Sequence, residues 1–291
     1  MFKGLGVAVI TPFKKNYDID FPALEKIIEH LISNGADYLV MLGTTGESVV
    51  LSKDEKKQIL KTAISINNKR LPIVAGIGGN NTLELIRYIE TFDFNGIDAV
   101  LSVSPYYNKP NQDGIYRHYK MIAEVCPKPI IIYNVPGRTS SNITSQTCLR
   151  LAKDFNNIIA TKEASGNFEQ IIQIVKNKPQ DFLVVSGDDL LCLPQMSIGF
   201  DGVISVIGNA FPREFSLMLQ QANTNPEEAR KILFKLEELI RLIFAEGSPS
   251  GIKGLMHIMG FCDKTVRPPL YELSESTTDK LAQLFKNCQS E

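Results

Sequence analysis

Lys162 is the residue whose type and setting most strongly suggest chemistry. It lies in the apolar run of residues 158–165 (IIATKEAS), on the same strand face as Ile158 and Ala160. Lysine is almost never buried without a partner, and burial lowers its pKa, so that a neutral amine can attack a ketone and form a Schiff base. The alternative is an ion pair with Glu163. Adjacent residues of a strand point to opposite faces, which favours the nucleophile.

Tyr133 belongs to the preceding apolar run, residues 129–137. A Schiff-base reaction needs a proton carrier, and no histidine stands at the end of any such run. Tyrosine can serve if neighbouring hydroxyl groups stabilise its phenolate or relay its proton. The alternative is an aromatic core residue whose hydroxyl group has a hydrogen-bond partner.

Two further places suit a small carboxylate. Thr44 and Thr45 supply hydroxyl and backbone N–H groups in a glycine-flanked turn. Arg138 follows a Pro-Gly pair in the loop after Tyr133, where a guanidinium can hold a carboxylate through two hydrogen bonds. The alternatives are an ordinary tight loop and a surface arginine.

These residues stand at the ends of apolar runs that recur eight times along the chain. Continuous apolar runs indicate strands buried on both faces, as in a parallel sheet. Eight strand–helix units predict an α/β fold of the (β/α)8 TIM-barrel class, with the active site at the C-terminal ends of the strands. An open doubly wound sheet is the alternative, but no GxGxxG motif follows the first run. The runs are residues 7–13, 38–47, 72–80, 99–107, 129–137, 158–165, 182–189 and 202–209.

The intervals between the runs show helical periodicity, and residues 52–55 (SKDE) match a capping box. From about residue 225 onward only helices are expected, over residues 227–245, 251–259 and 277–287. We therefore predict a catalytic barrel over residues 1–224 and a C-terminal helical region over residues 225–291. Residues 247–251 (GSPSG) form a local turn and not a linker.

Composition and charge disfavour several classes of protein. The 291 residues, 44% of them hydrophobic, can bury a large core, and 31 basic against 32 acidic residues argue against a nucleic-acid or membrane-surface binder. No apolar run approaches the ~18 residues of a membrane span, and the N-terminus lacks the features of a signal peptide. The five widely spaced cysteines are typical of reduced thiols in a cytoplasmic protein.

Metal, cofactor and phosphate chemistry are also disfavoured. The three histidines form no HxH or HExxH motif, and no two cysteines have the spacing of a zinc site. The loops after the last two runs, SGDD and VIGN, lack the glycines and N–H donors of a barrel phosphate site. We expect no metal and no organic cofactor.

Five short motifs, in order along the whole chain, resemble one family. GTTGES (43–48), SPYYNKP (104–110), YNVPGRT (133–139), KEASG (162–166) and SGDD (186–189) are similar to those of the 4-hydroxy-tetrahydrodipicolinate (dihydrodipicolinate) synthases of the N-acetylneuraminate lyase superfamily. The resemblance implies a (β/α)8 barrel with C-terminal helices, assembled as a homotetramer. It also implies condensation of pyruvate with L-aspartate 4-semialdehyde, the first committed step toward diaminopimelate and lysine, without a cofactor.

The resemblance assigns catalytic roles to four positions. Lys162 matches the Schiff-base lysine and Tyr133 the proton-transferring tyrosine. Thr44 and Tyr107 match the other members of a proton relay, with Tyr107 reaching in from a neighbouring subunit.

Four more positions match substrate contacts. Thr45 matches a contact to the pyruvate carboxylate, Arg138 the arginine at the semialdehyde carboxylate, and Gly187 and Ile204 backbone positions of the pocket. The arginine of YNVPGRT favours the synthase over a sialic-acid lyase or a 2-keto-3-deoxy sugar acid aldolase. A barrel without enzymatic activity is disfavoured by the intact set of catalytic residues.

The resemblance also implies an L-lysine effector site at a tetramer interface. The chain departs from inhibited relatives at Lys53 and Lys56, where those relatives often carry histidines. Two added positive charges near a site for a cation predict weaker inhibition. The matching positions are Ser48, Val49, Asn80, Glu84 and Tyr106.

Overall fold

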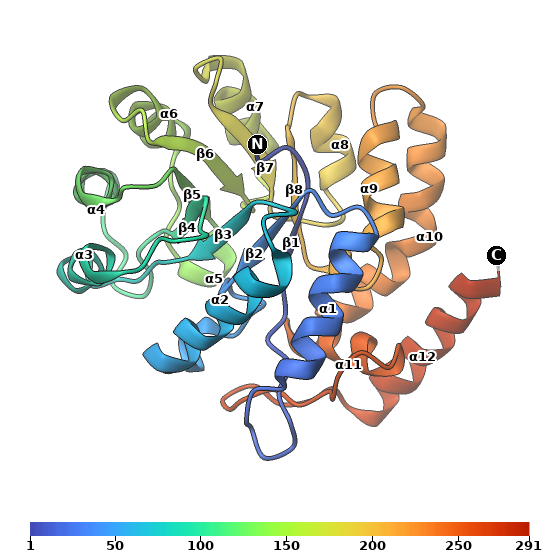
Figure 1. The fold of residues 1–291 in the computed structure, drawn as a ribbon. Coiled ribbons are helices and arrows are strands. Elements are labelled where there is room, and N and C mark those ends of the chain that lie inside the picture. The colour runs from blue at the N-terminus through green and yellow to red at the C-terminus, as the bar shows by residue number, and fades with distance from the viewer. Residues whose placement is uncertain (291) are drawn as a thin grey trace.

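The apolar runs form a closed barrel of eight parallel strands in the computed structural model of the chain (Figure 1). The structure describes residues 1–290, and residues 289 and 290 by their backbone alone. Each strand pairs with the next one along the chain, and β8 closes on β1. The predicted (β/α)8 barrel is confirmed, and the open doubly wound alternative is wrong. The strands are Gly4–Ala8 (β1), Tyr38–Met41 (β2), Ile73–Gly76 (β3), Ala99–Val103 (β4), Ile130–Asn134 (β5), Ile158–Glu163 (β6), Leu183–Ser186 (β7) and Gly202–Ser205 (β8).

The strands are shorter than the apolar runs, because each run continues past its strand into the following loop. The first strand also begins earlier than predicted, at Gly4 and not at residue 7. Gly4 pairs with Gly202 of β8, and the N–H of Leu5 donates to the carboxylate of Asp37 at 2.7 Å. These partners are distant in sequence, so hydrophobicity alone did not mark the start of β1.

Polar side chains fix where the helices between the strands begin. The predicted capping box is present: Ser52 accepts the N–H of Glu55, and the Glu55 carboxylate accepts the N–H of Ser52. Asn81, Asn111 and Asn167 cap three other helices, each through a side-chain oxygen that accepts one backbone N–H. The helices around the barrel are Phe21–Ser33 (α1), Lys53–Asn67 (α2), Thr82–Thr91 (α3), Gln112–Val125 (α4), Pro136–Thr139 (α5), Ser145–Asp154 (α6), Phe168–Asn177 (α7), Cys192–Ser197 (α8) and Pro212–Gln221 (α9), with 3₁₀ turns at Ser48–Val50 (η1) and Ile207–Asn209 (η2).

Three helices form the C-terminal region: Pro226–Ala245 (α10), Ser250–Ile258 (α11) and Glu275–Ser290 (α12). Their positions lie close to those predicted. In Figure 1 α10 stands beside α9, and α11 and α12 pack against α10. The division after residue 224 stays a prediction, and residue 291 lies outside the described residues. No helix in the described part of the chain is long and apolar enough to cross a membrane.

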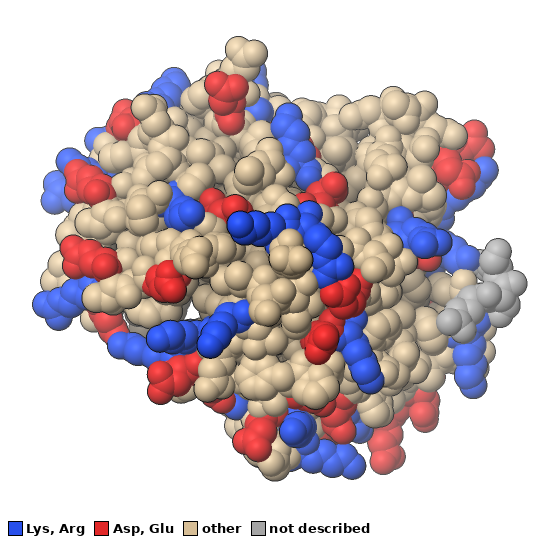
Figure 2. Space-filling model, viewed as in Figure 1, with Lys and Arg blue, Asp and Glu red and all other residues tan. Residues whose placement is uncertain are grey.

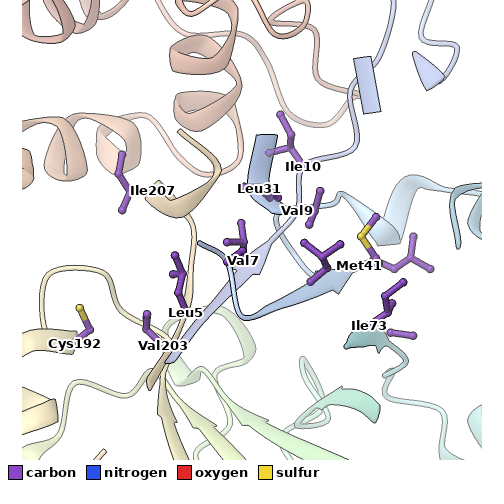
Figure 3. Packing of buried hydrophobic residues seen from close by; sticks show 14 of the residues in the cluster. Leu5, Val7, Val9, Ile10, Leu31, Met41, Ile73, Cys192, Val203 and Ile207 are labelled. Carbon is purple, nitrogen blue, oxygen red and sulfur yellow. The ribbon is translucent and has the colours of Figure 1, made fainter. Parts of the chain in front are cut away.

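The apolar side chains form two layers. One fills the barrel, and the other lies between the strands and the helices, where Figure 3 shows Leu5, Val7 and Met41. Along β5 and β6, Tyr133 and Ala160 belong to the inner layer, so Lys162 also faces inward. The prediction that Ile158 shares this face is wrong. Ile158 belongs to the outer layer, because the pairing of β5 with β6 shifts by one residue there.

Charges of both signs are interspersed over the surface. On the face in Figure 2, Lys and Arg side chains alternate with Asp and Glu side chains, and no large area carries one sign. This mixture matches the formal net charge of -1.

Candidate active site

A cavity of about 940 Å³ opens at the C-terminal ends of the barrel strands. Its inner part brings together residues from four separate strands or the loops that follow them, β2, β5, β6 and β7. This is where barrel enzymes place their catalytic groups. The lining residues of the inner part include Thr44, Thr45, Tyr133, Arg138, Lys162, Gly187, Asp188 and Asp189.

Lys162 and Tyr133 lie side by side at the base of this cavity. They are partners in the register of β6 and β5, and the Lys162 Nζ lies 4.4 Å from the centre of the Tyr133 ring. Only 5% of Lys162 is exposed. Burial lowers the pKa of Lys162 to about 8, with Arg138 also lowering it and Asp189 opposing. At pH 7 about a tenth of the amine is therefore neutral and able to attack a carbonyl group.

Tyr133 is a proton donor at neutral pH. Its burial raises the pKa of the phenol to about 12, and the guanidinium of Arg138 acts in the opposite direction. A protonated phenol next to a partly neutral amine gives the pair one acid and one base. This arrangement can move a proton during addition to a carbonyl group.

Glu163 is not the partner of Lys162. It points to the outer face of β6, where its carboxylate accepts hydrogen bonds from the Ser165 N–H at 2.7 Å and from the Asn134 amide at 3.1 Å. Asn134 and Glu163 are themselves register partners. The alternative ion pair considered for Lys162 is therefore wrong, as the two-residue period of a strand indicated.

Thr44 and Thr45 lie in a tight loop after β2. The loop is closed by hydrogen bonds from the Gly46 N–H to the Gly43 carbonyl and from the Glu47 N–H to the Thr44 carbonyl. Thr44 is exposed to the cavity mouth, whereas Thr45 is buried. Both residues line the same cavity.

Arg138 lies on the short helix α5, directly after the strand that carries Tyr133. Its Nη2 donates to the carbonyl of Ser248, in the turn between α10 and α11, at 3.4 Å. The contact keeps the guanidinium at the cavity wall, where a positive charge lowers the pKa values of both Lys162 and Tyr133.

The other predicted substrate and relay positions have different settings. A Cβ atom on Gly187 would lie 3.0 Å from the Lys162 Cε, so Gly187 packs directly on the lysine side chain. Ile204 lies in the apolar interior with Tyr133 and does not line the cavity. Tyr107 is 88% exposed and also lies outside the cavity lining of its own chain. Its backbone has a φ of 70°, which is rare for a residue with a side chain.

The outer part of the same cavity contains all five predicted effector residues. The Asn80 amide donates to the backbone carbonyl of Tyr106 at 3.4 Å, which joins the loops after β3 and β4. Lys53 and Lys56 also line this part. Burial lowers the pKa of Lys56, and the charge of Lys53 lowers it further, so the two lysines repel each other. The five predicted residues are Ser48, Val49, Asn80, Glu84 and Tyr106.

Comparison with known families matches residues 1–288 to the model of the dihydrodipicolinate synthetase family. This chain belongs to that family. A 4-hydroxy-tetrahydrodipicolinate synthase from Flavobacterium psychrophilum is 50% identical over 281 residues, which are 96% of either chain. The solved dihydrodipicolinate synthase from Aquifex aeolicus has a TM-score of 0.95 and 39% identity, over 99% of this chain and 98% of that one.

A third relative was solved with lysine bound. It is the dihydrodipicolinate synthase from Cyanidioschyzon merolae, with a TM-score of 0.95 and 35% identity over 99% of this chain and 98% of that one. The prediction of a lyase with 4-hydroxy-tetrahydrodipicolinate synthase activity is confirmed over the sialic-acid lyase and sugar-acid aldolase alternatives.

Two contributions to the site of this dihydrodipicolinate synthetase family member were given no role from the sequence. Asp189 is buried and accepts the N–H groups of Val206 and Ile207 at 3.0 and 2.9 Å, which holds a negative charge near Lys162. The C-terminal region also supplies one wall of the cavity, through Ile240, Arg241, Phe244, Ala245 and Ser248. Among the described residues, no group of three His, Cys, Asp or Glu side chains could hold a metal ion.

Proposed function

We propose that this chain condenses pyruvate with L-aspartate 4-semialdehyde through a Schiff base on Lys162. The observation that carries the proposal is the buried Lys162 amine, 4.4 Å from the centre of the Tyr133 ring in a cavity at the strand ends. Burial of the amine supports its role as a nucleophile, because it lowers the pKa toward neutrality.

The reaction begins when the neutral Lys162 amine attacks the ketone carbon of pyruvate. Loss of water from the adduct forms the imine, and loss of a methyl proton then forms an enamine. Tyr133 and Thr44 transfer these protons. The enamine carbon attacks the aldehyde carbon of the second substrate. The amine of that substrate finally displaces Lys162, which releases the cyclic product and the free enzyme.

Two carboxylate sites fix the substrates in this scheme. The loop with Thr45 holds the carboxylate of pyruvate, since it offers hydroxyl and N–H donors in the same cavity as Lys162. Arg138 holds the carboxylate of the semialdehyde. Its hydrogen bond to Ser248 leaves the remaining N–H groups of the guanidinium for a bidentate contact. Gly187 shapes the space around the imine, and Ile204 supports that space from the apolar layer beneath the cavity.

The site is completed by a second subunit in this proposal. Tyr107 is exposed and lies outside the cavity lining of its own chain, and its N–H donates to the Thr139 carbonyl at 3.4 Å. Val49, which lines the cavity, and Leu83, which lines a neighbouring pocket, are also exposed apolar residues. We place the proton-relay tyrosine of each site in the neighbouring subunit of a homotetramer.

L-Lysine is the proposed effector at the outer part of the cavity. The Glu84 carboxylate can pair with its ammonium group, and Asn80 with Tyr106 can hold its carboxylate. The lysine-bound relative from Cyanidioschyzon merolae supports this assignment. Ser48 lies on the chain directly after the loop of Thr44, so a ligand there can influence the relay. We also propose a cytoplasmic location, which the free thiols of Cys126, Cys148, Cys192 and Cys262 favour.

The decisive experiment is reductive trapping. Incubation with pyruvate and borohydride should add one pyruvate-derived mass, and peptide mapping should locate it at Lys162. Turnover is then compared with L-aspartate 4-semialdehyde and with sialic acid, of which only the semialdehyde should react. An adduct that persists in Lys162→Ala would refute the assignment of the nucleophile.

A further inference from the structure

Lys253 is a completely buried lysine outside the catalytic cavity. It lies on α11 in the C-terminal region, and none of its side chain is exposed. Its Nζ forms an ion pair with Glu47, donates to the Thr265 carbonyl at 2.9 Å and lies 4.0 Å from the centre of the Phe13 ring. Burial lowers the pKa of Lys253, and the Glu47 carboxylate opposes this effect.

Glu47 is the last residue of the loop that carries Thr44 and Thr45. Its φ is 53°, in the left-handed region, so its backbone is held in an unfavourable conformation. One carboxylate oxygen pairs with Lys253, and the other accepts the backbone N–H of Arg267 at 2.9 Å. Both oxygens are therefore held by the C-terminal region, about two hundred residues away in sequence.

Arg267 extends the same connection to the start of α2. Its guanidinium donates to the Val50 carbonyl at 3.0 Å and to the Tyr17 carbonyl at 2.7 Å, and it pairs with Glu55. It also lies 4.5 Å from the centre of the Phe13 ring, which Lys253 contacts as well. The C-terminal region thus holds the segment after β2 at Glu47, at Val50 and at Glu55.

Stability alone does not account for such a pair. Replacing a buried ion pair by well-packed apolar residues is often neutral or stabilising, because both charges lose their hydration. An ion pair instead fixes the orientation of its side chains, since a carboxylate with two fixed partners has one orientation. Here the fixed side chain is that of Glu47, the residue that ends the Thr44 loop.

We propose that Lys253 and Glu47 are positioning residues that hold the loop of residues 43–47 so that Thr44 and Thr45 face the substrate. The C-terminal region is then part of the catalytic apparatus, although it supplies no reacting group. The inference rests on the proposed roles of the two threonines. A displacement of about 1 Å in such a group can lower a rate by roughly a hundredfold.

The test compares Lys253→Met, Glu47→Gln and the double variant. Each single change leaves one buried charge or polar group without its partner, and Lys253→Met should lower Tm by roughly 6–20 °C. The double variant has no unpaired charge and should recover most of that loss. The readout is the rate of deuterium exchange at the pyruvate methyl group, divided by the number of sites that form an imine trapped by borohydride. In the double variant this rate should stay roughly ten- to a hundredfold below that of the unmodified enzyme.

Two further variants make the outcome specific. Lys264→Met removes a charge from an exposed ion pair with Glu272, 3.1 Å apart in the same region, and should leave exchange unchanged. Thr44→Val should slow exchange if the relay is assigned correctly. Normal exchange in Thr44→Val would overturn both the relay and the positioning role. Slow exchange in Thr44→Val with normal exchange in the double variant would overturn the positioning role alone.

Discussion

Gly187 lies against the side chain of Lys162, so that a Cβ at position 187 would be 3.0 Å from the Lys162 Cε and 2.7 Å from the Ala164 Cβ. Real Cβ atoms essentially never come within 2.7 Å of another carbon atom, so Ala164 or position 187 would have to shift, and the 3.0 Å approach to the Lys162 Cε is tight as well. The absence of a side chain at position 187 therefore leaves the space that the Lys162 side chain occupies. Gly187, which limits the space for the Lys162 side chain, directly follows β7, the strand paired with β6.

Gly187→Ala should slow imine formation by about tenfold or more, because the lysine side chain or β7 has to move. The measurement is the rate of borohydride-trapped adduct at low pyruvate concentration. Gly137→Ala is the matched control, since a Cβ there meets no atom within 4 Å. An unchanged rate in Gly187→Ala would show that the site accommodates the methyl group.

The rate of imine formation should depend on pH through Lys162. Because the pKa of Lys162 is about 8, the fraction of neutral amine increases about tenfold per pH unit below pH 8 and is nearly constant above it. Arg138 lowers this pKa, so Arg138→Gln should move the profile to higher pH, whereas Arg230→Gln on the exposed side of α10 should not. Trapping rates between pH 6 and 10 provide the test. Identical profiles for both variants would contradict the influence of Arg138.

Lys162→Met should stabilise the fold while abolishing the reaction. The unfolded lysine holds its proton up to about pH 10.5, but the folded one only up to about pH 8. Native stability therefore rises with pH between these values, and the destabilisation by the buried charge is complete below pH 8. Its removal is worth on the order of 3 kcal/mol at pH 7, and the gain disappears toward pH 10.5. Denaturant unfolding at both pH values, with Lys176→Met as an exposed control, measures this difference.

Inactive subunits should complement each other if Tyr107 acts across an interface. Mixed oligomers of Tyr107→Phe and Lys162→Ala contain some sites with both native groups, and these should regain activity. Mass measurement of the intact assembly verifies that mixing occurred. Verified mixed oligomers that remain inactive would place both groups in the site of a single chain.

L-Lysine should inhibit at subsaturating pyruvate, and more weakly than in relatives with histidines at positions 53 and 56. The repulsion between its ammonium group and the nearby lysine charges is the cause, reduced by solvent screening. Glu84→Ala should relieve the inhibition, whereas Glu90→Ala, on the same helix but away from the cavity, should not. A flat titration into the tens-of-millimolar range would remove the effector proposal.

The sequence predicted those parts of the site that depend on local periodicity. Eight apolar runs indicated the barrel, and the alternation along a strand separated Lys162 from Glu163. Asp189 could not be assigned in this way, because its partners are N–H groups at 206 and 207 that only the closed barrel brings near. Phe244 and Ser248 show the same limit, since amphipathic periodicity does not reveal against which part of the barrel a helix packs.

The tie between Glu47 and Lys253 bears on how this protein can be recombined with its relatives. A chimera that joins one parent's barrel to another parent's C-terminal helices cuts between positions 47 and 253. Each half then brings a charged group whose partner was fitted to it in a different parent. Positions 47 and 253 therefore have to be taken from the same parent. A substitution at one of them restricts which residues are compatible with folding and activity at the other.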